Sequence, residues 1–242
     1  RLPLDAEHGL ALLPEPTPDD IFLDFEGNRF TDAGVHEYLT GYVIKANDGS
    51  FNYTPLWATT LDEERKAFEQ FIDFATATRA KNPNAHIYHF APYEPSAIKQ
   101  LMNRYATCEL EVDTLLREEA FVDLLKVVKR SLFASVEGYS IKNLEVFFGY
   151  ERKQDLREAS MSRRLLEAAL EADDVDSVFE QYRQIIEDYN REDCESTSRL
   201  QDWLEQLRAD ATKSGLDLPR PFTPYGDVSD AVSELDAKLH QL

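Results

Sequence analysis

Apolar and polar residues alternate in short runs over the first quarter of the chain, and alternation of this kind is typical of β-strands. We expect three strands within residues 19–57: one around Asp24, then 35–45 and 51–57. Asn47, Asp48 and Gly49 predict the turn between the second and the third strand. Helical spacing follows over 61–79, then a strand at 85–90 and a helix at 95–105.

The second half of the chain is mostly helical by pattern, with a possible short strand at 120–123. A long helix is expected over 176–209, because apolar residues recur there in steps of three and four. This stripe comprises Tyr182, Ile186, Tyr189, Thr197, Leu200, Leu204 and Leu207. Strands followed by helices alternating with strands predict an α/β fold, with a mixed central β-sheet flanked by α-helices.

The chain has 242 residues, 43% of them hydrophobic, which is enough for one full core. We expect a leader at 1–18, one domain at 19–209, and a linker with a short terminal helix at 210–242. Gly215, Pro219, Pro221 and Pro224 predict that linker. The chain begins at Arg1 without a signal sequence, which indicates a piece excised from a longer protein.

The first candidate site is Asp24 and Glu26, two positions apart inside an apolar run. On a strand both carboxylates project from one face. Burying them is costly unless a partner neutralises them, and a divalent metal is the usual partner. The alternative is a solvated strand end, where such pairs arise by chance.

The second candidate is Asp193, which fills the gap in the helical stripe, with Tyr189 one turn earlier on the same face. A phenol and a carboxylate would therefore point together into the protein, whereas Glu192 and Glu195 would fall on other faces. Asp193 could equally pair with a buried arginine or cap a neighbouring element.

The third candidate is Glu94, where an apolar strand leads into a helix. Pro95 fits the first position of that helix, so Glu94 would lie at the junction, facing a crevice. A charge cap at the helix N-terminus is the alternative. His86 and His89 lack the companions of a zinc site and are expected to be polar strand residues.

Together these segments resemble the DEDD-type 3'-5' exonucleases of the ribonuclease H-like superfamily. The matching residues are Asp24 and Glu26, then His89 to Glu94, then Tyr189 and Asp193. In more detail, the motif sequences resemble those of the ribonuclease H-like domain of RecB-family nucleases. That similarity adds Tyr88, Tyr93, Pro95, Val122-Asp123-Leu124, Tyr139 to Glu145, Gly149 and Asn190, and the resemblance covers about residues 18–208. One departure is Glu94, where the superfamily usually has Asp.

The resemblance implies a ribonuclease H-like fold and a two-metal site for Mg²⁺ or Mn²⁺. Oxygen ligands suit these ions, and two such ions can activate water and stabilise a leaving oxygen. The implied metal ligands are Asp24, Glu26, Glu94 and Asp193, and Tyr189 would orient the attacking water. His89 and Asp123 are supporting candidates, although Asp123 could simply bind nearby backbone at its strand end.

Charge complicates this interpretation, because the net charge of −20 argues against a general nucleic-acid-binding surface. Residues 126–164, however, hold nine basic residues against five acidic ones, a net charge of +4. Lys126, Arg130 and Lys142 in this band are candidates for nucleic-acid contact, although such a band is commonly just a solvated helix face.

The function expected from the sequence is a metal-dependent 3'-5' exonuclease acting on DNA or RNA, with single-stranded 3' ends as substrate. RecB-like and helicase regions of a longer protein would be its partners, with DNA repair as the context. The alternatives are a catalytically weak module of the same fold that positions nucleic acid or a helicase partner, and an unrelated acidic interaction protein. The sequence contains no run of 18 apolar residues, so we expect no membrane span. Cys108 and Cys194 lack metal or disulfide spacing, so a reducing cytoplasm is expected.

Overall fold

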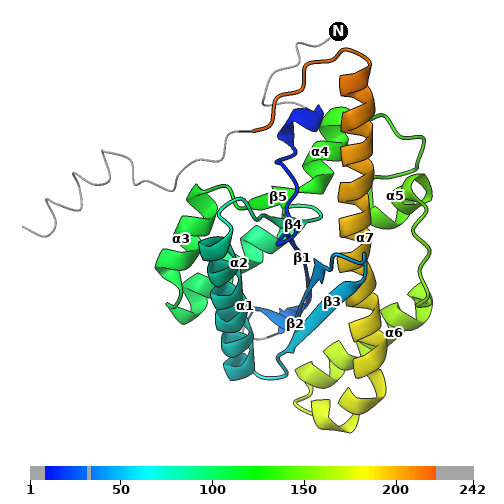
Figure 1. Ribbon diagram of the computed structural model, residues 1–242. Coiled ribbons are helices and arrows are strands. Elements are labelled where there is room, and N and C mark those ends of the chain that lie inside the picture. Colours follow the sequence, from blue (N-terminus) through cyan, green and yellow to red (C-terminus); the bar gives the residue numbers. More distant parts are fainter. Residues whose placement is uncertain (1–8, 32–33, 222–242) are drawn as a thin grey trace, which may run out of the picture.

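A five-stranded mixed sheet forms the centre of the computed structural model, which describes residues 9–31 and 34–221 (Figure 1). Its strand order is β3-β2-β1-β4-β5. The strands are β1 (Ile21–Thr31), β2 (Gly34–Lys45), β3 (Phe51–Trp57), β4 (Ile87–His89) and β5 (Phe121–Asp123). The first three pair antiparallel, whereas β4 and β5 join β1 in parallel. The carboxyl ends of β1, β4 and β5 therefore point the same way.

Alternation along β1 divides the interior into two layers. Ile21, Leu23 and Phe25 pack on one face, in a core with the first group of helices. Phe22 packs on the other face, beside residues of the long C-terminal helix. Because side chains alternate along a strand, Asp24 and Glu26 share this second face.

The first face is covered by α1 (Leu61–Lys81), α2 (Tyr93–Tyr105) and α3 (Glu109–Arg117). Helix α1 begins at a capping box. The Thr60 side chain accepts a hydrogen bond from the Glu63 N–H, and the Glu63 side chain accepts one from the Thr60 N–H. Phe68, Phe71 and Ile72 of α1 recur at helical spacing and are almost completely buried.

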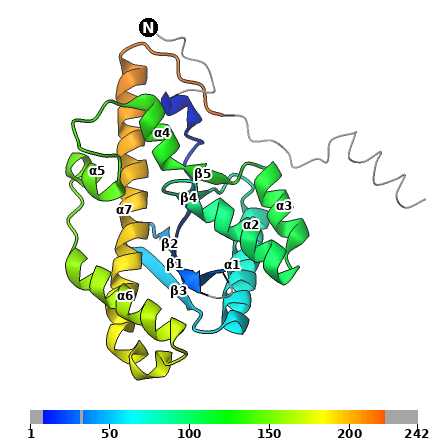
Figure 2. The same ribbon diagram turned by 180° about the vertical axis from the view of Figure 1, so that it is seen from behind.

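The second face is covered by the elements that follow β5, and Figure 2 shows them from behind. They are α4 (Leu124–Ser131), α5 (Ile141–Phe148), α6 (Leu156–Glu171), the 3-10 turn η2 (Val175–Ser177) and α7 (Phe179–Lys213). The 35 residues of α7 make it roughly 50 Å long at 1.5 Å per residue, so it contacts β1, β2, β3 and β4. One helix can therefore present side chains to several strands.

Most predicted elements are confirmed within a few residues, including the mixed sheet flanked by helices. Two details differ. Helix α2 begins at Tyr93, so Pro95 is its third residue and Glu94 lies within the first turn. Glu192 is buried on α7, although the stripe placed it on another face, because the segment 149–155 covers it.

The expected leader and linker contribute to the core where they are described. The turn η1 (Gly9–Leu12) leads to Leu13, which is fully buried, and Leu218 is nearly so. Arg220 donates to the carbonyls of Leu13 and Pro14, which joins the described parts of the leader and the linker. The terminal helix expected at 228–242 lies outside the described residues. Among the described helices none is long and apolar enough to cross a membrane.

Candidate metal centre

Three carboxylates meet between β1 and α7. One oxygen each of Asp24, Glu26 and Asp193 lies within 4.8 Å of the others. Glu26 and Asp193 are 5% and 6% exposed, and Asp24 is partly buried. The strand supplies two of them by alternation and the helix supplies the third from its inward face. The expectation from the sequence was that these carboxylates would share one cleft with Glu94, and the group within 4.8 Å consists of Asp24, Glu26 and Asp193 alone.

Close packing of α7 on β2 sets the position of Asp24. Gly41 pairs with Asp24 across the antiparallel ladder, and Asn190 of α7 fills the space above it. The Asn190 Nδ2 donates to the Asp24 Oδ2 at 2.9 Å and to its carbonyl at 3.2 Å. The Tyr53 hydroxyl donates to the Asn190 Oδ1 at 2.9 Å. This chain of bonds orients both the amide and the carboxylate.

The carboxylates ionise unequally because their surroundings differ. Burial raises the pKa of Asp24 well above its usual range, and the neighbouring charges of Asp193 and Glu26 add to the effect. Burial also raises the pKa of Glu26 to about 7, although Arg163 opposes the shift. For Asp193, burial disfavours the charge, yet Lys142 and Arg152 together hold its pKa below the usual range. Clustered acids of this kind resist ionisation unless cations compensate them.

Three basic side chains supply this compensation. The Lys142 Nζ lies 2.7 and 2.8 Å from the two Asp193 oxygens. The Arg152 Nη2 lies 2.6 Å from Asp193 Oδ1, and the Arg163 Nη1 lies 2.6 Å from Glu26 Oε2. Lys142 therefore belongs to the centre itself, where it was expected only as a nucleic-acid contact.

Tyr189 lies among these cations. Its ring centroid is 4.9 Å from Lys142 Nζ, 5.8 Å from the Arg152 Cζ and 5.0 Å from the Arg163 Cζ. Burial, with Asp193 contributing, raises the pKa of Tyr189 to about 12. The phenol is therefore neutral at ordinary pH and can both donate and accept a hydrogen bond.

The segment 149–155, between α5 and α6, carries Arg152 to the centre. Glu192 of α7 accepts from the N–H groups of Lys153 at 2.6 Å and Gln154 at 3.2 Å. Arg152 also pairs with Glu145 of α5, at 2.6 Å from its Nη2 and 2.9 Å from its Nε. These bonds fix an otherwise irregular segment, so the guanidinium has a defined position.

Glu94 is not part of the group of three, although its charge contributes to the raised pKa of Asp24. It is 3% exposed, and its Oε2 lies 3.2 Å from the His89 Nδ1. That nitrogen is closer to the Ala91 carbonyl, at 2.6 Å. A single ring N–H can donate a well-aligned hydrogen bond to the carbonyl or to the carboxylate, but not to both. Glu94 Oε2 has no hydrogen-bond partner within the described residues, so a buried carboxylate oxygen beside the centre is available to a ligand.

The remaining candidates lie at the N-terminus of α4. Asp123 caps that helix, accepting from the N–H groups of Leu125 and Lys126, and also from that of Ala91. Its local role is therefore the backbone-binding alternative. Lys126 and Arg130 are exposed on α4, and among the described residues the ion pairs of the three carboxylates are made by Lys142, Arg152 and Arg163 instead.

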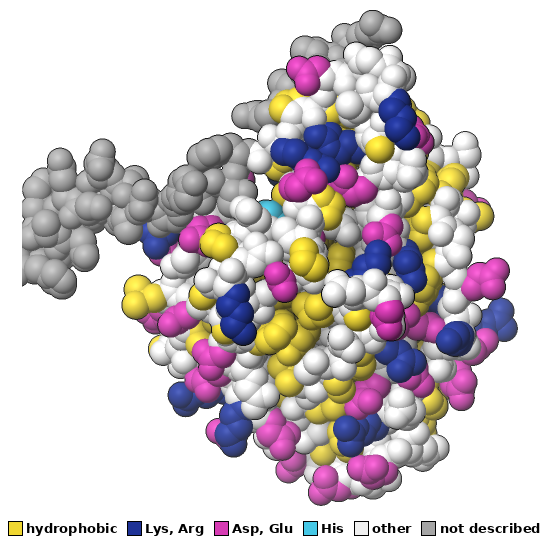
Figure 3. Space-filling view, viewed as in Figure 1, with side chains coloured by type: hydrophobic (Ala, Val, Ile, Leu, Met, Phe, Trp, Pro, Cys, Tyr) yellow, Lys and Arg dark blue, Asp and Glu magenta, His cyan; other side chains and the backbone are white. Residues whose placement is uncertain are grey.

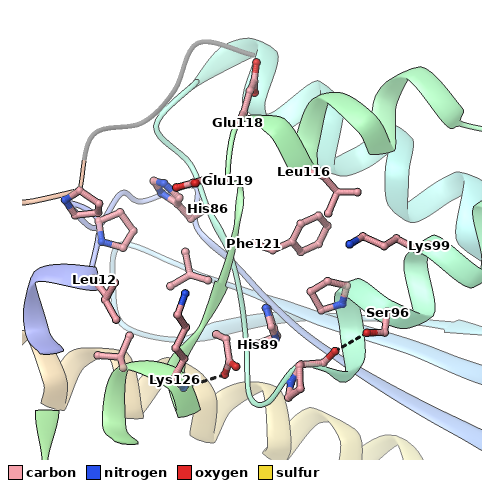
Figure 4. A pocket seen from close by; sticks show the side chains of 17 residues that line it. Leu12, His86, His89, Ser96, Lys99, Leu116, Glu118, Glu119, Phe121 and Lys126 are labelled. Atoms are coloured by element: carbon pink, nitrogen blue, oxygen red, sulfur yellow. Dashed lines mark hydrogen bonds between the residues drawn. The ribbon is translucent and has the colours of Figure 1, made fainter. Parts of the chain in front are cut away.

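A pocket of about 500 Å³ is lined by residues of β4, β5, α2 and α4 (Figure 4). His89 and Phe121 line it from the sheet, His86 from the residue before β4, and Lys99 and Lys126 from α2 and α4. None of the three carboxylates is among its lining residues. We place the chemistry at the carboxylates, because the side-chain convergence there has no counterpart in the pocket.

A model of the RNase_H_2 family, in the RNase H superfamily, matches residues 21–205. The chain belongs to this family. The matched range begins at β1 and ends within α7, so it contains every residue of the centre. No curated protein and no solved structure matches the chain. Membership in the RNase H superfamily suggests nuclease activity and nucleic-acid binding.

The residues of this RNase_H_2 domain fit a divalent metal. RNase H-like nucleases generally use such ions, and carboxylate oxygens are the ligands that hard cations prefer. Asp24, Glu26 and Asp193 would hold the ion, and Glu94, whose Oε2 lies 3.2 Å from the His89 Nδ1, is a further candidate ligand. Mg²⁺ and Mn²⁺ both suit this set of donors.

Sequence reasoning gave Asn190 and Arg163 no role at the centre, and it allowed for a buried arginine beside Asp193 without identifying Arg152. The basic band at 126–164 contains both arginines, but the band alone did not show which of its members reach the carboxylates. The surface in Figure 3 shows acidic and basic side chains scattered together over one face of the molecule. The positive charge that matters at the centre is therefore local.

Proposed function

We propose that this RNase_H_2 domain is a metal-dependent 3'-5' exonuclease that hydrolyses phosphodiester bonds of DNA or RNA. One observation carries the proposal: Asp24, Glu26 and Asp193 converge within 4.8 Å in a protein of the RNase H superfamily. Tyr189 lies one helical turn from Asp193, as in the exonuclease motif that the sequence resembles. The phenol beside the carboxylates favours the exonuclease reaction over other chemistry of the superfamily.

Each side chain has a role in this proposal. Mg²⁺ or Mn²⁺, when bound, would activate water and stabilise the charge that develops on the leaving oxygen. Asp24, Glu26, Asp193 and Glu94 would hold the ions. Tyr189, which is neutral because its pKa is raised to about 12, would accept or donate a hydrogen bond to orient the attacking water.

A nuclease assay tests the proposal directly. Single-stranded DNA and RNA, each labelled at the 5' end, are incubated with the protein and either Mg²⁺ or Mn²⁺. We expect a ladder of products shortened from the 3' end, and no such ladder for Asp193→Asn. A blocked 3' end should protect the strand. Intact strands with both metals, or cleavage only at internal positions, would refute the exonuclease assignment.

A second candidate function is a weakly catalytic module that positions nucleic acid or a helicase partner. Glu94 favours it, because its carboxylate is near His89 and outside the group of three. Detectable nucleic-acid binding without hydrolysis would support this alternative. The RecB-like and helicase neighbours, and a role in DNA repair, belong to the same set of proposals.

A further inference from the structure

Three cations lie among the three carboxylates of the centre. Lys142 comes from α5, Arg152 from the segment 149–155, and Arg163 from α6. Asp193 and Glu26 accept the contacts that these cations make with the three carboxylates, at 2.6–2.8 Å, and Arg152 also pairs with Glu145 at 2.6 Å. Asp24 is bound instead by the neutral Asn190 amide.

A divalent metal would need the oxygens that these cations now occupy. Lys142 Nζ contacts both oxygens of Asp193, and Arg163 Nη1 contacts one oxygen of Glu26. Metal binding at those oxygens would weaken the ion pairs and bring like charges close together. The three cations would then favour an anion in the same space.

Two donors of these arginines already lack partners. Arg152 Nη1 and Arg163 Nε are buried, and neither has a hydrogen-bond partner among the described residues. Guanidinium groups bind phosphate through several donors at once, which makes them suitable for a phosphodiester. The side chains of Lys142 and Arg163 are 29% and 31% exposed, so a strand could reach them from solvent.

We propose that Lys142, Arg152 and Arg163 form an exchangeable clamp, which neutralises the carboxylates when metal is absent and binds the scissile phosphate of the nucleic acid when metal is present. The clamp rests on the proposed function, since it assigns the phosphate contacts of the same site. The cations compete with metal and cooperate with phosphate, so their removal has opposite effects on the two ligands. Ion pairs that were merely structural would not have this signature.

The experiment measures both ligands by titration calorimetry, using Mn²⁺ alone and then thymidine 5'-monophosphate at saturating Mn²⁺. The variants are Lys142→Met and Arg163→Gln, whose partly exposed side chains make folding less sensitive than at Arg152, which is 7% exposed. The matched controls are Lys45→Met and Arg183→Gln. Each control removes a cation paired with a different carboxylate of α7, Asp202 or Glu187.

Both site variants should bind Mn²⁺ more tightly and the nucleotide more weakly, each by at least about 5-fold, the lower end of typical coupling between sites. The controls should leave both affinities unchanged. Weaker or unchanged Mn²⁺ binding in both site variants, no Mn²⁺ binding to any of the proteins, or unchanged nucleotide binding would overturn the clamp. If the site variants bind Mn²⁺ more tightly and the nucleotide more weakly, but the wild-type protein hydrolyses no strand, the exonuclease function is refuted and the clamp is retained.

Discussion

Gly41→Ala should damage the centre through Asn190, although it adds only one methyl group. A Cβ at Gly41 would lie 1.6 Å from the Asn190 Oδ1 and 2.7 Å from its Cγ. Such distances are impossible, so the amide must leave its place. The Tyr53 ring, 3.0 Å from the same point, limits the room for adjustment.

The cost follows from the bonds that Asn190 makes. Its displacement breaks two bonds to Asp24 and one from Tyr53. At about 0.5–1.5 kcal/mol each, and more for a charged acceptor, the loss is about 2–5 kcal/mol of unfolding free energy. A chain of this size loses about 2–4 °C of Tm per kcal/mol, which predicts a decrease of roughly 4–20 °C.

Thermal and denaturant unfolding measure this loss. Gly138→Ala is the control, because the nearest atom to its added Cβ is 3.8 Å away. It should change stability by less than about 1 kcal/mol. In the Asn190→Ala background, Gly41→Ala should lower the unfolding free energy much less than it does in the wild type, because the amide that the new Cβ meets is absent. Substitutions without such a clash change the unfolding free energy by about 1 kcal/mol or less. A Gly41→Ala protein whose unfolding free energy lies within about 1 kcal/mol of wild type would therefore refute the reasoning.

Three further predictions concern Tyr189, metal binding and Glu37. Tyr189→Phe should lower the single-turnover hydrolysis rate by roughly 10²- to 10⁴-fold while Mn²⁺ affinity persists, and a wild-type rate would limit the phenol to packing. Millimolar Mn²⁺ should raise Tm in the wild type and less in Asp24→Asn, because binding to the folded state alone stabilises it; equal shifts would exclude Asp24 as a ligand. Burial raises the pKa of Glu37 from 4.5 to about 7, so its protonated form stabilises the fold and that stability is lost as pH rises through 7. The unfolding free energy of wild type relative to Glu37→Gln should therefore fall by about 2.5 kcal/mol between pH 5 and pH 8, and a constant difference in denaturant unfolding would contradict this.

Local periodicity accounts for what the sequence predicted of the centre. Alternation on a strand was enough to place Asp24 and Glu26 on one face. Helical spacing was enough to place Tyr189 and Asp193 together. Both rules act within a few residues, so neither needs a knowledge of tertiary contacts. The mixed sheet followed from the order of these elements along the chain.

The partners of these carboxylates depend on long-range packing, which periodicity does not report. Asn190 reaches Asp24 only because Gly41, on another strand, leaves room for it. Arg152 lies in an irregular segment whose position depends on Glu192 of α7. Glu192 itself was misplaced because the helical stripe ignored what the segment 149–155 would cover. Contacts across 38 or more residues thus decide the electrostatics of the centre.

The net charge of −20 is compatible with nucleic-acid binding if the phosphate contacts are few and local. Only Lys142, Arg152 and Arg163 are expected to contact phosphate, and single strands lose affinity with a log–log salt slope of about −0.7 per neutralised phosphate. Binding of a labelled single strand at fixed Ca²⁺ should therefore show a slope no steeper than roughly −2, the limit at which each of the three cations neutralises one phosphate, measured by fluorescence anisotropy between low and moderate salt. Arg163→Gln should reduce it by about 0.7, whereas Arg183→Gln should not. A slope near −5 in the wild type would show that a broad basic surface binds the strand, and the local clamp would then be too small to explain binding.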